Sequence, residues 1–138
     1  MAELSVTSFI QTVLGPIPSN RLGTCMIHEH LLVDFIGASK ITRDRYERRQ
    51  VFNVMLPYLL RIKKQGFEAF AECTPMFLGR DPVLLRELSS ASGMHLIINT
   101  GLYAAGERDN IPEPYLPEYA YKLSADQLSG AWIREWFD

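Results

Sequence analysis

Two histidines stand two positions apart in an apolar stretch, TCMIHEHLLVDF, which covers residues 24–35. Side chains of a β-strand alternate between its faces, so His28 and His30 are expected on one face, with Glu29 and Leu31 on the other. Two neighbouring imidazoles can chelate one divalent cation such as zinc, whereas a buried imidazole without a partner is costly. The spacing leaves two interpretations open: metal ligands, or polar core residues satisfied by hydrogen bonds.

A carboxylate on the next predicted strand is a second candidate. Glu72 lies in FEAFAECTP (67–75) and shares a strand face with Thr74. If that face is interior, Glu72 can orient a metal-bound imidazole from behind. The alternative is a salt bridge or a solvent-facing carboxylate. Cys25 is expected to be a small buried hydrophobe that faces away from the histidines. His95 is expected to pack at the start of its strand, away from any site.

These residues need elements to position them, and the sequence alternates strand-like with helical segments. Apolar strand-like runs cover 8–14, 23–31, 67–75 and 94–103, and helical patterns cover 42–65, 79–93 and the residues after 124. A Gly- and Pro-containing turn, GPIPSN (15–20), follows the first run. This alternation is typical of a parallel sheet with helical crossovers. In such folds, functional residues lie at the carboxyl ends of the strands.

Proline, aspartate and glycine mark the predicted helix ends. Pro57 interrupts 42–65 and predicts two helices, with Pro57 in the first turn of the second. Asp81 is the predicted N-cap of 79–93, and Gly93 follows its end.

The last predicted helix begins with a capping box. Ser124 and Gln127 have the required spacing. Leu128, Trp132 and Trp136 recur every four positions, which predicts one apolar stripe that packs into a core.

Composition narrows the class of protein. The chain has 138 residues, of which 47% are hydrophobic and 22% charged, with a net charge of −2. One globular domain, 1–138, is therefore expected. Without a basic excess, nucleic acid is a poor partner. No stretch resembles a signal peptide or a membrane helix. Two cysteines do not make a disulfide framework and indicate a reducing, cytoplasmic setting.

Four motifs carry a family resemblance: TVLGPI (12–17), LGTCMIHEHLLVD (22–34), ECTPMFLGRD (72–81) and NTGLY (99–103). In their order and separations they resemble the phosphotriesterase-related family of the amidohydrolase superfamily, over essentially the whole chain. The resemblance implies an α/β fold, a TIM (β/α)8 barrel. These residues would form its N-terminal part, a leading β segment and about three βα units.

The resemblance also implies a metal-dependent hydrolase with two divalent metals, usually zinc, at the carboxyl ends of the strands. His28 and His30 would be ligands of the more buried metal. A metal-bridging hydroxide would attack a phosphotriester, lactone or carboxylic ester, a small-molecule substrate. Tyr103 falls where the family presents an aromatic residue at the pocket mouth, and tyrosine there favours a lactone or another ester. The alternative for Tyr103 is an ordinary half-buried aromatic residue.

One departure from the family limits these expectations. Such a barrel needs about 250 residues, and this sequence holds two of the family's six metal ligands. Lys63 and Lys64 lie in a predicted helix and Lys122 precedes one, so none is expected to bridge the metals. We therefore expect the N-terminal fragment of a hydrolase, inactive and poorly stable by itself. A full-length homodimer, the substrate and the identity of the metal stay open.

Two alternatives stay open as well. The first is a non-catalytic half-barrel that serves only as a structural or interaction module. The second is another HxH barrel hydrolase, such as a metal-dependent deoxyribonuclease, against which the absence of a basic groove counts.

Overall fold

The computed structural model describes residues 8–104 and 114–137, and these residues group into two units. The first unit holds 8–31, 46–73 and 81–98. The second holds 32–45, 74–80 and the described residues from 99 onward.

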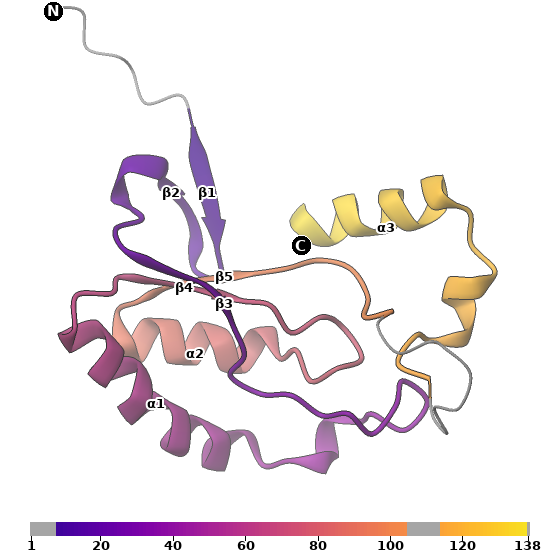
Figure 1. The fold of residues 1–138 in the computed structure, drawn as a ribbon, viewed down its shortest axis with the longest axis horizontal. Helices are drawn as coiled ribbons and strands as arrows, with labels where there is room; N and C mark the ends of the chain where they lie inside the picture. The colour runs from indigo at the N-terminus through magenta and orange to yellow at the C-terminus, as the bar shows by residue number, and fades with distance from the viewer. Residues whose placement is uncertain (1–7, 105–113, 138) are drawn as a thin grey trace, which may run out of the picture. The chain divides into compact units, whose positions relative to one another are not determined.

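Three parallel strands form the sheet of the first unit (Figure 1). They are β3 (Cys25–Glu29), β4 (Ala69–Glu72) and β5 (His95–Ile98), in the spatial order β3-β4-β5. Helices α1 (Arg48–Lys64) and α2 (Pro82–Ser92) connect them and lie on the same side of the sheet. The predicted parallel sheet with helical crossovers is thus confirmed, and one-sided helical cover is the arrangement of a barrel wall.

The core of the first unit lies between this sheet and its two helices. Leucines dominate it, because each removes a large apolar side chain from water and contributes roughly 1.5–3 kcal/mol. The least exposed apolar residues of this unit are Leu59, Ala69, Leu84, Leu88, Met94 and Leu96. They come from both helices, β4, β5 and the residue before β5, so the core fixes the crossovers to the strands.

The segment predicted as a turn after residue 14 forms a strand instead. β1 (Phe9–Thr12) and β2 (Gly15–Pro18) make an antiparallel hairpin. Backbone N–H groups two residues apart in a strand point to the same side. The positions of Pro16 and Pro18, which lack an N–H group, can therefore both face away from β1, where no ladder hydrogen bond is lost. A hydroxyl closes the turn, since Thr12 Oγ1 donates to the Gly15 carbonyl at 2.7 Å. The two prolines thus mark an edge strand.

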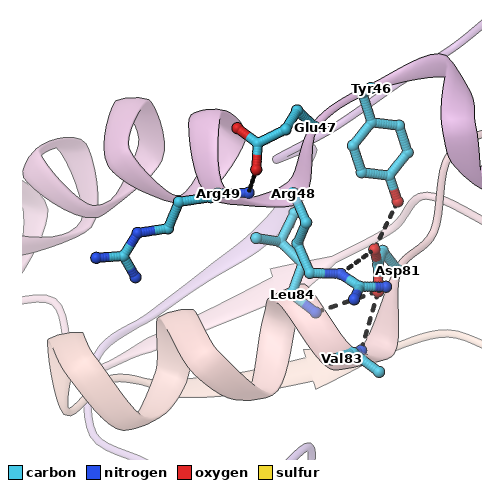
Figure 2. Close-up of polar contacts among 7 residues, drawn as sticks. All are labelled: Tyr46, Glu47, Arg48, Arg49, Asp81, Val83 and Leu84. Carbon is cyan, nitrogen blue, oxygen red and sulfur yellow. Dashed lines mark hydrogen bonds and ion pairs between the residues drawn. The ribbon is translucent and has the colours of Figure 1, made fainter.

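The predicted break at Pro57 is wrong, because α1 runs without interruption from Arg48 to Lys64. Proline removes one helical hydrogen bond and crowds the preceding turn. Leu59, two residues later, is fully buried. Packing of the helix face that carries Leu59 therefore offsets the cost of a proline inside the helix. The start of α1 lies after the predicted residue 42, where the Glu47 carboxylate accepts hydrogen bonds from the backbone N–H groups of the first turn (Figure 2).

The predicted ends of α2 are confirmed. Asp81 is its N-cap and accepts hydrogen bonds from the N–H groups of Val83 and Leu84, both at 3.1 Å. Pro82 is its first residue. Gly93 ends the helix in the left-handed conformation, at φ 67°, which glycine adopts without steric cost.

The second unit contains α3 (Ala125–Phe137) and its confirmed capping box. Ser124 N donates to Gln127 Oε1 at 2.8 Å, and Gln127 N donates to Ser124 Oγ at 3.3 Å. Packing of the tryptophan stripe into a core is not what the structure shows. Trp132 is 36% exposed and Trp136 53%, so neither tryptophan side chain is buried in a core. None of the described helices is long and apolar enough to span a membrane.

Candidate metal centre

The two histidines lie side by side at the carboxyl end of β3. Their ring centroids are 5.3 Å apart with an interplanar angle of 71°, and both side chains are exposed, whereas Leu31 is buried. Two imidazoles that share a tetrahedral zinc have centroids about 5 Å apart, since Zn–N is ~2.1 Å. The spacing of His28 and His30 therefore fits two ligands of one cation.

β3 is irregular where it carries the pair. Its parallel register with β4 shifts between Met26 and Glu29, so strict period-two alternation does not describe this end. A bulge re-aims the side chains next to it and is common beside functional sites. The sequence predicted that His28 and His30 are neighbours, but nothing in it signals this register shift.

Glu72 is buried at the end of the neighbouring strand. It is 2% exposed, so the solvent-facing alternative does not hold. Its Oε1 accepts a hydrogen bond from the backbone N–H of Leu31 at 3.2 Å, and its residue partner across the strands is Glu29. This contact fixes the backbone directly after His30. Glu72 therefore supports the chain that carries the histidine pair.

Two imidazoles are only part of a metal site. Among the described residues, no group of three or more His, Cys, Asp or Glu side chains could hold a metal ion. Two of the lysines make contacts elsewhere. Lys63 Nζ donates to the carbonyls of Ser92 and Gly93, and Lys122 pairs with Glu118. The donor set fits a divalent cation in type and spacing, and the remaining ligands would have to come from outside these residues.

Cys25 and His95 are predicted to be structural residues and not metal ligands, and their surroundings agree with that prediction. Burial raises the pKa of the Cys25 thiol, a shift that a backbone hydrogen bond with Ala71 opposes. A protonated, partly buried thiol behaves as a small hydrophobe. His95 begins β5 and pairs with Ala69 in the register, which places it at the amino end of the strands.

Tyr103 lies in the second unit, within a cluster of three aromatic rings. Its centroid is 6.1 Å from that of Phe35 and 5.7 Å from that of Tyr115, and Phe35 and Tyr115 are 5.4 Å apart. Tyr103 is half-buried, whereas Phe35 is 57% exposed. Sequence reasoning missed Phe35 and Tyr115, because both stand in loops without periodicity.

Curated proteins that resemble this chain include hydrolases. An N-acetyltaurine hydrolase of Tetraodon nigroviridis is 28% identical over 121 residues, which cover 68% of this chain and 35% of that protein. An aryldialkylphosphatase of Saccharolobus solfataricus is 26% identical over 119 residues, which cover 86% of this chain and 35% of that protein. The chain thus spans about a third of the length of these relatives.

A solved structure shares the fold. The organophosphorus hydrolase from Deinococcus radiodurans matches with a TM-score of 0.64 at 27% identity, over 71% of this chain and 30% of that one. The fold is thereby identified as the N-terminal part of a (β/α)8 barrel. The model of the phosphotriesterase family matches residues 8–135, nearly all of the sequence. This chain belongs to the phosphotriesterase family.

Proposed function

We propose that the full protein containing this chain is a metal-dependent hydrolase and that His28 and His30 bind a divalent metal such as zinc. The observation that carries the proposal is the exposed imidazole pair, 5.3 Å between ring centroids, at the carboxyl end of β3. Family membership supports the same conclusion. A second divalent metal and the remaining ligands, as the family resemblance implies, would lie outside these residues.

The chain's own residues hold and orient the donors. When bound, a divalent metal supplies a Lewis acid and makes a nucleophile of bound water at neutral pH. His28 and His30 would hold it. Glu72, through its hydrogen bond to Leu31 N, keeps the backbone next to His30 in place. Exposure of both imidazoles leaves the pair open to water and substrate.

The proposed substrate is a small ester: a phosphotriester, a lactone or another carboxylic ester. The aryldialkylphosphatase and the organophosphorus hydrolase support the phosphotriester by their names. An N-acyl amide is a second candidate, since the first relative is an N-acetyltaurine hydrolase. In either case we propose Tyr103 as a wall of the substrate pocket. We also propose that the full protein works in the cytoplasm. We further propose that it forms a homodimer, which light scattering would test.

Metal binding is the first test. The complete protein that contains these residues is freed of metal and titrated with Zn²⁺ by calorimetry, together with its variants His28→Ala, His30→Ala and the control His95→Ala. We expect binding by the unsubstituted protein and by His95→Ala, and at least about tenfold weaker binding by the other two, because each loses one imidazole donor. Equal affinity in all four proteins would contradict the assignment of the ligands.

Activity is the second test. The complete open reading frame that contains these residues is expressed and assayed with an aryl dialkyl phosphate, a lactone, a carboxylic ester and an N-acyl amide. We expect hydrolysis of at least one substrate, with kcat lowered about 100-fold or more by His28→Ala or His30→Ala. No hydrolysis of any of them would favour the alternative, a structural or interaction module.

A further inference from the structure

A hollow of about 750 Å³ lies within the first unit, at the amino ends of β4 and β5. The histidine pair lies at the other end of the sheet, where β3 finishes. Cavities of this size hold small organic ligands. The walls come from the end of β2, from the 3₁₀ helix Ser19–Arg21, and from residues that begin or precede strands. The residues that the argument uses are Ile17, Pro18, Asn20, Arg21, Glu68 and His95.

Backbone hydrogen bonds fix the floor of this hollow. Glu68 N donates to the Thr24 carbonyl at 2.9 Å, and His95 N donates to the Glu68 carbonyl at 2.9 Å. Gly23 is in the left-handed conformation at φ 69°, and a Cβ there would clash with the Glu68 side chain. The Glu68 side chain therefore packs directly on the backbone of Gly23. Its carboxylate has a defined place in the hollow before any ligand binds.

Two opposite charges line the hollow without pairing with each other. Within residues 8–104 and 114–137, no ion pair joins Arg21 to Glu68, and neither side chain has a hydrogen-bond partner. Both side chains are exposed, so both are open to a ligand. A guanidinium binds a carboxylate through two parallel hydrogen bonds, and a carboxylate accepts hydrogen bonds from an ammonium group. One ligand that carries both groups would satisfy both side chains.

The same hollow has an apolar wall, formed by the half-buried Ile17 and Pro18. A ligand with a negative charge alone would meet Glu68, and one with a positive charge alone would meet Arg21. Each would place like charges side by side, which is unfavourable. The lining therefore favours a zwitterion with an apolar substituent over a simple anion or cation.

We propose that this hollow is a binding site for an α-amino acid with an apolar side chain. Arg21, with the Asn20 amide beside it, binds the α-carboxylate, and Glu68 accepts hydrogen bonds from the α-ammonium group. Ile17 and Pro18 contact the apolar side chain, and His95 closes the hollow at the start of β5. The site is separate from the histidine pair and does not depend on the proposed hydrolysis.

Binding of leucine tests the proposal. The full protein is titrated with L-leucine by calorimetry, next to its variants Arg21→Gln and Glu68→Gln, each of which removes one charge. Arg86→Gln and Glu87→Gln are the matched controls, since both residues are exposed on α2 and do not line the hollow. We expect equal affinity in the unsubstituted protein and the two controls. Arg21→Gln and Glu68→Gln should bind at least about tenfold more weakly, because each loses a charge-assisted contact.

Two analogues of leucine test the need for both charges. 4-Methylpentanoate lacks the ammonium group, and 3-methylbutylamine lacks the carboxylate. Each should bind at least about tenfold more weakly than leucine. An analogue that binds as tightly as leucine, or no binding of leucine, overturns the inference. If a glutamine variant does not fold, this comparison of three ligands on the unsubstituted protein decides.

A last variant separates the hollow from the proposed metal centre, because an amino acid can also chelate a metal ion. Leucine binding that is lost in His28→Ala and kept in Arg21→Gln would place leucine on the metal. That result overturns the inference and leaves the hydrolase proposal standing. Conversely, a protein that hydrolyses none of the test substrates but binds leucine through Arg21 and Glu68 supports the inference alone.

Discussion

Asp81 shows how much one side chain can organise in this chain (Figure 2). Its carboxylate caps α2, accepts from the Tyr46 hydroxyl at 2.6 Å, and forms an ion pair with Arg48 at 2.8 Å. Burial by itself would raise the pKa of Asp81, but hydrogen bonds from Arg48, Tyr46 and Leu84 N outweigh burial and lower it. One carboxylate therefore joins the start of α1 to the start of α2.

Replacing Asp81 with asparagine tests this contribution, because asparagine keeps the cap and removes the charge. We expect Asp81→Asn to lower the free energy of unfolding at pH 7 by about 1–3 kcal/mol. Because the pKa of Asp81 is lowered in the folded state, its ionised carboxylate stabilises the fold at pH values above the pKa of an unfolded aspartate, near 3.9. That stability is lost as the pH falls through the folded pKa. Between pH 7 and pH 2, urea unfolding should therefore show a smaller decrease in the free energy of unfolding for Asp81→Asn than for the unsubstituted protein.

The control for Asp81 is an exposed ion pair. Glu118 pairs with Lys122, and both side chains are mostly solvent-accessible. Glu118→Gln should change the free energy of unfolding by less than about 1 kcal/mol. An effect as large as that of Asp81→Asn would mean that burial is not what makes the Asp81 contacts stabilising.

At the residue scale, local spacing was predictable and distant partners were not. The cap at Asp81 followed from its position before Pro82, and the adjacency of His28 and His30 followed from the period of a strand. Arg48 and Tyr46 lie 33 and 35 positions from Asp81, so no local pattern could pair them. The hydrogen bond between Glu72 and Leu31 likewise joins residues 41 positions apart, so no local pattern predicts it.

At the scale of elements, the alternation of strands and helices was predictable because apolar periodicity reflects burial. The sequence predicts the wrong structure at two prolines. In β2, prolines typical of a turn lie in an edge strand, which tolerates them. In α1, Pro57 predicts the start of a new helix, but buried Leu59 holds one continuous helix in the core. In both places the tertiary context decides, which a local rule does not see.

The proline inside α1 yields a prediction of its own. Pro57 lies inside the helix without a backbone donor, so Pro57→Ala should restore one hydrogen bond and relieve crowding. We expect the free energy of unfolding to rise by about 1–3 kcal/mol, measured by urea denaturation. Val54→Ala, at an exposed site of the same helix, reports helix propensity alone. It should change the free energy of unfolding by about 0.5 kcal/mol. A destabilised Pro57→Ala would mean that α1 needs its proline.

At the scale of the whole molecule, the described residues of the first unit leave apolar surface and one strand edge uncovered. β3 is at one edge of the order β3-β4-β5, and its Ile27 is 81% exposed. An unpaired strand edge with an exposed isoleucine is a template for association. The helices cover one side of this sheet (Figure 1), and in a complete barrel the other side is filled by further strands.

A polypeptide of these 138 residues should therefore self-associate as its concentration rises. Light scattering after size exclusion should show the mass increasing, and Ile27→Lys should reduce it, because a charge at an edge strand opposes pairing. Val54→Lys is the matched control: Val54 is 59% exposed on α1, away from the strand edge, and its substitution should leave the mass unchanged. A constant monomer mass, or an equal effect of both substitutions, would show that the edge of β3 does not drive association.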